Sequence, residues 1–86
     1  MPAEVLVTYK IMPESPEVDF STIIAEIRKL GDVKDTKEEP IGFGLKALKV
    51  LVMIKDEEGN KAEEIAEQIA KIKGVQSAEA ESVSLI

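Results

Sequence analysis

The sequence predicts an α+β fold in which two helices cover one face of a four-stranded antiparallel sheet. Three observations support this prediction. Segments of two-residue apolar period alternate with segments of helical period in the order β-α-β-β-α-β. The longest apolar run, from Leu48 to Ile54, has the length of a central strand and is broken only by Lys49. Glycine or proline separates consecutive elements.

The first strand is predicted over Ala3–Met12, where side chains alternate between two faces, and a proline-containing loop ends it. The first helix is predicted over Phe20–Leu30, with Asp19 as its N-cap and Gly31 as the glycine that stops it. One face of the strand carries Val5, Val7, Tyr9 and Ile11, and the helical stripe is Phe20, Ile23, Ile24, Ile27 and Leu30.

A polar second strand is predicted over Val33–Ile41. Pro40 confines it to an edge of the sheet, because proline lacks the amide hydrogen that a central strand needs. The chain then turns through Gly42-Phe43-Gly44 into a third strand over Leu45–Lys55. One face of that strand carries Leu48, Val50, Val52 and Ile54, and the other carries Ala47, Lys49, Leu51 and Met53.

A second apolar stripe at helical period, from Ala62 to Ile72, follows a capping pattern at Asn60 and precedes Gly74, which we expect to stop the helix. The last strand is predicted over Val75–Ile86. The complete order is that of the split βαβ, or ferredoxin-like, plait. From its length we expect residues 1–86 to form a single domain, and this order places the first and third strands side by side at the centre of the sheet.

Composition excludes several classes of function. The chain has no cysteine and no histidine, so the commonest metal ligands and the commonest general base are missing. The net charge of −6 and the presence of only three aromatic residues argue against binding to nucleic acid. No signal peptide or membrane-spanning run is recognisable, so we expect a cytoplasmic protein without a cofactor.

No catalytic constellation emerges from the remaining residues. The acidic run Asp56-Glu57-Glu58 has the composition of a solvated turn before a helix, although carboxylates could in principle hold a hard cation. The loop after the first strand is acidic, which is unsuited to an acylphosphatase-like enzyme that must cradle a phosphate.

Two features are open to both a structural and a functional interpretation. The sheet face away from the helices is half apolar, which suits either a partner or an ordinary central strand covered by lysine side chains. Phe43, between two glycines, is either an exposed contact residue or an aromatic that folds back on the core.

Two distant motifs resemble translation elongation factor 1-beta, a family of guanine nucleotide exchange factors. Residues 40–46, P-I-G-F-G-L-K, are similar to the hairpin of that family, and residues 75–79, V-Q-S-A-E, are similar to its closing strand. The opening strand with residues 12–16, M-P-E-S-P, resembles the archaeal branch, whose members are single short domains. The resemblance covers nearly the whole chain.

The resemblance implies a ferredoxin-like fold and a partner, the GTPase elongation factor 1-alpha, from which GDP is released. It implies that the hairpin aromatic, Phe43, touches the GTPase. Eukaryotic members carry a basic residue before the last aliphatic one, where this chain has Leu85, so that role is not transferred. Lys46, Lys49 or Lys10 is left to supply a cation. The expected partner-binding residues are Gly42, Phe43, Gly44, Lys46, Lys49, Leu51, Met53, Leu85 and Ile86.

A second class of function remains open. Plaits of this order also serve as regulatory ligand-binding or oligomerising modules, which pair their sheets in dimers. A stable dimer that buries the open face would favour that class. The sequence leaves the oligomeric state undetermined.

Overall fold

The computed structural model describes residues 4–42, 44–55 and 61–85, which form four strands and two helices in the expected order. The ferredoxin-like arrangement predicted from the sequence is confirmed. The third strand and the starts of α1 and β4 have the predicted bounds, and the other described ends differ from prediction by one or two residues. The elements are β1 (Glu4–Pro13), α1 (Phe20–Arg28), β2 (Asp32–Gly42), β3 (Leu45–Lys55), α2 (Lys61–Ala70) and β4 (Val75–Leu85).

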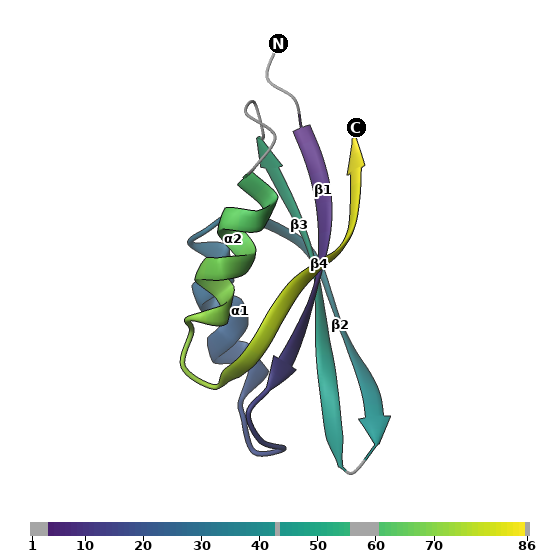
Figure 1. Cartoon of the computed structure of the whole chain (residues 1–86), viewed down its shortest axis with the longest axis vertical. Coiled ribbons are helices and arrows are strands. Elements are labelled where there is room, and N and C mark those ends of the chain that lie inside the picture. Colours follow the sequence, from purple (N-terminus) through teal and green to yellow (C-terminus); the bar gives the residue numbers. More distant parts are fainter. Residues whose placement is uncertain (1–3, 43, 56–60, 86) are drawn as a thin grey trace.

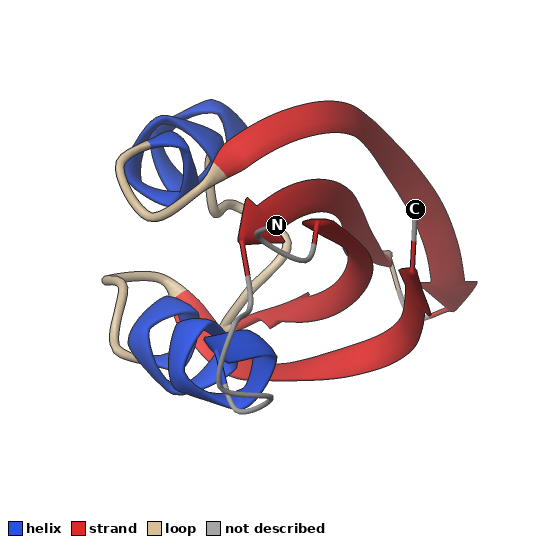
Figure 2. Ribbon diagram, turned by 90° about the horizontal axis from the view of Figure 1, so that it is seen from above, coloured by secondary structure: helices blue, strands red, loops and turns tan. Residues whose placement is uncertain are grey.

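The sheet has the strand order β2-β3-β1-β4, with every neighbouring pair antiparallel. β1 and β3 are central, as predicted, and the proline-bearing β2 is an edge strand. Figure 1 shows that the sheet is strongly twisted and that the β2–β3 hairpin lies at the opposite end of the molecule from the end of β4. Both helices lie on the same side of the sheet (Figure 2), so the described elements leave its other face open.

The core lies between the helices and one face of the central strands. Alternation along β1 and β3 sends every second side chain into this core, and two isoleucines of α1 and two of α2 meet them there. Tyr9 is fully buried, and its hydroxyl donates a hydrogen bond to the carbonyl oxygen of Ala62 at 2.8 Å, which holds the start of α2 against the sheet. The core comprises Val5, Val7, Tyr9, Ile11, Ile23, Ile27, Leu48, Val50, Val52, Ile54, Ala62, Ile65, Ile69 and Val75.

The glycines predicted to stop the helices have other roles. α1 ends at Arg28, two residues before the predicted Leu30, and Gly31 is absent from the glycines with positive φ. A Cβ at Gly31 would lie 2.7 Å from Cγ1 of Val52, so this position needs glycine for close packing. Gly74 has φ 96°, but α2 ends at Ala70, so Gly74 serves the turn into β4. The predicted cap Asn60 lies outside the described residues.

Asp19 caps α1 as the sequence predicted. One carboxylate oxygen, Oδ1, accepts hydrogen bonds from the backbone amide of Ser21 at 2.9 Å and from its hydroxyl at 2.7 Å. These two hydrogen bonds, the side-chain one foremost, lower the pKa of Asp19 below its ordinary value. A carboxyl whose pKa is lower in the folded state stabilises the fold above its unfolded pKa, and this contribution is lost as the pH falls through the folded value.

We expect the Asp19→Asn variant to lose less stability than the parent chain when the solution is acidified from neutral pH. Asparagine still offers an oxygen to Ser21, but it has no proton to take up. Thermal unfolding measured along a pH series checks this prediction. Asp19→Ala, which removes the cap at every pH, serves as the control and should lower the melting temperature at neutral pH as well. An unchanged acid dependence in Asp19→Asn would contradict the prediction.

Candidate partner-binding surface

The side of the sheet away from the helices, called the open face below, is built from alternate residues of the two central strands. All of its members except Ala47 are partly buried, in contrast to the fully buried residues on the helix side. Ala47 is buried but does not belong to the core cluster, which corrects the prediction that it contributes exposed surface. The remaining members are Leu6, Thr8, Lys10 and Met12 of β1 and Lys49, Leu51 and Met53 of β3.

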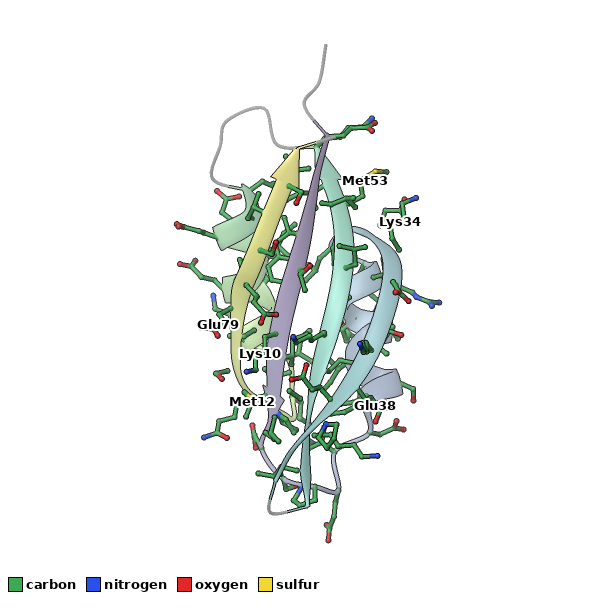
Figure 3. The ribbon with its side chains drawn as sticks, turned by 90° about the vertical axis from the view of Figure 1, so that its right-hand side faces the viewer. Lys10, Met12, Lys34, Glu38, Met53 and Glu79 are labelled. Carbon is green, nitrogen blue, oxygen red and sulfur yellow. The ribbon has the colours of Figure 1, made fainter. Side chains whose placement is uncertain are left out.

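The apolar part of the open face lies toward the end of β4. Leu6 pairs directly with Met53, and Thr8 pairs with Leu51. Figure 3 views this face and shows Met53 near the end of the sheet that is remote from the hairpin. On the adjoining edge strand, Asp35 is the register partner of Leu51, so an acidic residue borders the apolar patch. Two of the residues predicted to bind a partner, Leu51 and Met53, therefore lie together here.

A row of lysines crosses the open face nearer to the hairpin. Lys49 on β3 is the register partner of Lys37 on β2 and also of Lys10 on β1. Lys10 in turn pairs with Glu79 on β4, and Figure 3 shows these two residues on neighbouring strands. Like charges directly opposite one another destabilise a sheet. The row therefore needs carboxylates close to it.

Two carboxylates offset the positive charge of Lys49. Its ammonium Nζ lies 3.0 Å from Oε2 of Glu39 and 3.3 Å from Oε2 of Glu81. Glu39 belongs to β2 and Glu81 to β4, the two edge strands of the sheet. The Lys49 side chain is 27% exposed, whereas Lys29, Lys34 and Lys46 are 71%, 45% and 60% exposed in their own ion pairs. Lys49 is thus on the open face, as predicted, but its charge is already engaged.

The contacts of Lys49 alter the pKa values of the groups involved. The hydrogen bond from Lys49, together with its positive charge, lowers the pKa of Glu39, and Lys10 and Lys37 add smaller effects in the same direction. The hydrogen bonds to Glu39 and Glu81 raise the pKa of Lys49, although burial opposes them. A lowered carboxyl pKa and a raised amine pKa both favour the ionised pair, which therefore persists through the neutral range.

The hairpin end places Lys46 on the other side of the sheet from Lys49. Along β3 the alternation puts Lys46 on the same side as Leu48, which faces the helices. Its Nζ is 4.0 Å from Oε1 of Glu38, and its side chain is 60% exposed. Lys46 and Glu38 line a hollow of about 470 Å³ whose other walls include Phe20 and Ile24 of α1. The predicted cation candidates therefore lie on two faces.

The two glycines of the hairpin are required by their backbone conformation. Gly42 has φ 100° and Gly44 has φ 75°, which is the region that side chains with a Cβ rarely adopt. A Cβ at either position would meet nothing within 4 Å, so space is not the constraint. Phe43 between them and Ile86 at the chain end lie outside the described residues, as does the side chain of Leu85, whose backbone ends β4 opposite Val5.

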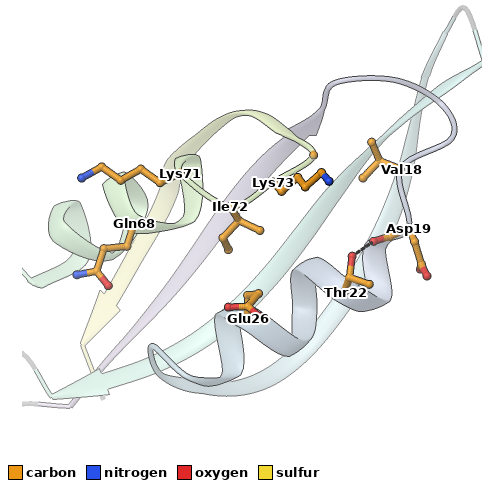
Figure 4. A pocket seen from close by; sticks show the side chains of 9 residues that line it. Val18, Asp19, Thr22, Glu26, Gln68, Lys71, Ile72 and Lys73 are labelled. Atoms are coloured by element: carbon orange, nitrogen blue, oxygen red, sulfur yellow. Dashed lines mark hydrogen bonds between the residues drawn. The ribbon is translucent and has the colours of Figure 1, made fainter.

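A second hollow lies on the helix side, between α1 and α2, at the end where Gly74 leads into β4. Its volume is about 680 Å³, and Figure 4 shows Ile72 between the two helices with Thr22 and Glu26 on one wall and Lys71 on the other. Its rim has as many cationic as anionic side chains, so it carries no net charge. None of the residues predicted to bind a partner lines this hollow.

Residues 4–42, 44–55 and 61–85 contain neither a cluster of metal-ligating side chains nor a helix that could span a membrane. That part of the chain holds no group of three or more Asp or Glu residues placed to ligate a metal ion. Its helices are too short and too polar to cross a membrane. The acidic run Asp56-Glu57-Glu58, considered above as a possible cation site, lies outside the described residues.

Glu39 and Glu81 were not predicted as partners of Lys49. Glu39 could have been found, because it stands on the edge strand next to the lysine-bearing one in the predicted hairpin. Glu81 could not, because its nearness to Lys49 depends on the register between β1 and β4, two strands distant in sequence. Thr8 pairs with Ser82 whereas Tyr9 pairs with Ala80, so Glu81 is an extra residue in the β1–β4 ladder. Such a β-bulge leaves no reliable sign in the sequence.

Comparisons with known proteins agree with the motifs of the sequence. A family model described as the EF-1 guanine nucleotide exchange domain matches residues 6–86. Elongation factor 1-beta of Methanoculleus marisnigri is 46% identical over 82 residues, covering 95% of this chain and 96% of the relative. Elongation factor 1-beta of Methanosphaerula palustris is 44% identical over 77 residues, covering 88% and 89%. Elongation factor 1-beta of Pyrococcus abyssi is 43% identical over 82 residues, covering 90% and 89%.

Proposed function

Because the chain belongs to the elongation factor 1-beta family, whose exchange domain acts in translation elongation, we propose that it promotes GDP release from elongation factor 1-alpha in the cytoplasm. The observation that carries the proposal is the family match, which spans residues 6–86. GTP then occupies the emptied site. The factor itself makes and breaks no covalent bond.

The proposed activity needs only a difference in affinity. A partner that binds the nucleotide-free GTPase more tightly than the GDP-bound GTPase must weaken GDP binding by the same factor. The surface that binds must therefore recognise a conformation, and catalytic side chains are unnecessary. The chain suits this role, because its described residues include a four-stranded sheet with an open, partly apolar face.

We assign the contact with the GTPase to two regions. One is the hairpin, with Phe43 as the main contact and Gly42 and Gly44 allowing its turn. The other is the apolar part of the open face, Leu51 and Met53, together with Leu85 and Ile86 at the end of the chain. Lys46 is the cation candidate that suits direct contact, since the carboxylate of Glu38 is 4.0 Å from its ammonium and its side chain is 60% exposed.

We expect the Phe43→Ala variant to accelerate GDP release about tenfold less than the parent chain, because an aromatic contact residue at an interface contributes more than 1 kcal/mol. The measurement is the rate at which labelled GDP leaves elongation factor 1-alpha with increasing amounts of factor. The parent chain must accelerate release at micromolar concentration for the proposed function to stand.

The control for this experiment is Phe20→Ala, which removes the same side chain from a residue packed against the core. It should lower the melting temperature and leave exchange unchanged at a temperature where the variant is folded. Phe43→Ala should show the opposite pattern. A large loss of melting temperature with Phe43→Ala would assign that residue to the core and contradict its proposed contact.

A further inference from the structure

The contacts of Lys49 join two strands that are not neighbours. The strand order is β2-β3-β1-β4, so Glu39 lies on the strand beside Lys49 whereas Glu81 lies two strands away in the other direction. The Lys49 ammonium, at 3.0 Å and 3.3 Å from their carboxylates, reaches across β1 to meet Glu81. We call Lys49, Glu39 and Glu81 the open-face clamp.

Glu81 lies at a bulge on the open face. Up to Ala80 the ladder is regular, with Glu79 opposite Lys10 and Ala80 opposite Tyr9, so alternation puts Glu81 on the same face as Lys10. Glu81 is the extra residue between Ala80 and Ser82, so it has no register partner on β1. Its carboxylate lies instead 3.3 Å from the ammonium of Lys49.

The two carboxylates belong to strands that lead to different ends of the molecule. Glu39 stands three residues before Gly42, where β2 enters the hairpin. Glu81 stands four residues before Leu85, where β4 ends at the opposite end of the sheet. The clamp thus connects the arm that carries the hairpin with the strand that carries the chain end.

The charges around the clamp argue against direct contact between Lys49 and the GTPase. Lys10 and Lys37 flank it in register, and both contribute to lowering the pKa of Glu39. A partner that took Lys49 for itself would leave Glu39 and Glu81 without their nearest cation. Direct contact would therefore cost the two ion pairs that the free protein already has.

We propose that Lys49 is a positioning residue, which holds the hairpin arm and the C-terminal strand at the angle that the GTPase requires, and that it does not touch the GTPase itself. This inference rests on the proposed function, since it concerns the same docking surface. It replaces the expectation from the sequence that Lys49 is a contact residue. The clamp acts through geometry, so Glu39 and Glu81 should matter as much as Lys49.

The first experiment needs no partner. The chain has no cysteine, so spin labels can be placed at Glu38→Cys near the hairpin and at Ser84→Cys near the end of β4. Distances between the labels are then measured in the parent background, with Lys49→Met, and with Lys49→Arg. We expect Lys49→Met to broaden the distance distribution and Lys49→Arg to restore it, since arginine can bridge two carboxylates. Identical distributions for the parent and Lys49→Met overturn the inference, whether or not exchange is observed.

The second experiment compares GDP release by Lys49→Met with release by the double variant Glu39→Gln/Glu81→Gln. If Lys49 is a positioning residue, Lys49→Met and the double variant should each slow GDP release by about fivefold. This effect is within the range found for residues that touch neither ligand. The triple variant should be no slower than either, because all three residues act as one unit. Lys49→Arg should retain most of the activity.

If Lys49 instead touches the GTPase directly, removing the two carboxylates should not slow GDP release. Removing Glu39 and Glu81 would free the ammonium, so the double variant would match or exceed the parent while Lys49→Met alone would be slow. That result overturns the inference and leaves the proposed exchange function intact. If the parent chain fails to accelerate GDP release from elongation factor 1-alpha, the proposed exchange function is wrong. The distances between the labels still decide whether the clamp sets the angle between the hairpin arm and β4.

Discussion

Replacing Leu48 with alanine is expected to lower the free energy of unfolding by about 2–5 kcal/mol, the range found for buried leucines that leave a cavity. Leu48 lies on the central strand β3, faces the helices and is 1% exposed. Domains of this size have a total stability of only about 5–15 kcal/mol, so the variant should be close to unfolding at ambient temperature. Chemical denaturation followed by circular dichroism measures the loss.

Leu51 provides a matched control on the same strand. It lies three residues further on, faces the open side of the sheet and is only partly buried. We expect Leu51→Ala to cost about 1 kcal/mol or less in stability, since less apolar area is removed from contact. If the open face binds the GTPase, the same change should slow GDP release markedly. Equal stability losses at the two positions would contradict the division of β3 into a core face and a docking face.

Replacing Gly31 with alanine is expected to cost about 2–3 kcal/mol, which is the upper part of the range for overpacked cores. The added Cβ would stand 2.7 Å from Cγ1 of Val52 and 3.2 Å from Cγ2 of Ile54. Both valine and isoleucine are buried and β-branched, so neither can swing aside without disturbing the core. The melting temperature should fall by about 4–8 °C for each kcal/mol lost.

Lys29→Ala is the control for Gly31→Ala, because it changes a nearby residue at the end of α1 whose side chain is 71% exposed. Its pair with Glu26 is an exposed one, so the stability should change by less than about 0.5 kcal/mol. A Gly31→Ala variant as stable as Lys29→Ala would show that the start of β2 can shift away from Val52, and it would contradict the close packing inferred at Gly31.

The fold could be predicted because its signals are local. The alternation along β1, the stripes of α1 and α2, and the apolar run of β3 each record which side chains face the core. The proline in β2 correctly indicated an edge strand, since an edge tolerates a missing amide hydrogen. The predicted C-terminal end of α1 was wrong by two residues, because Gly31 predicts a helix stop whereas its role is to let β2 approach Val52.

The candidate site was predictable only in part. Alternation along β3 placed Lys49, Leu51 and Met53 on the open face before the structure was known. The same rule places Lys46 on the helix side, so the hairpin cation and the open face do not form a single surface. The assignment of Phe43 and Ile86 to the contact with the GTPase stays a prediction, since both lie outside the described residues.

The sequence by itself determined the order of the elements, the two central strands and the family, because periodicity and motifs are properties of short stretches. Only the tertiary structure decided what the open-face residues do to one another. The pairing of β1 with β3 and with β4 brings Lys10 beside Lys49 and places Glu81 3.3 Å from its ammonium. These strands are distant in sequence and are joined by backbone hydrogen bonds that form whatever the side chains are, so no local pattern encodes their pairing.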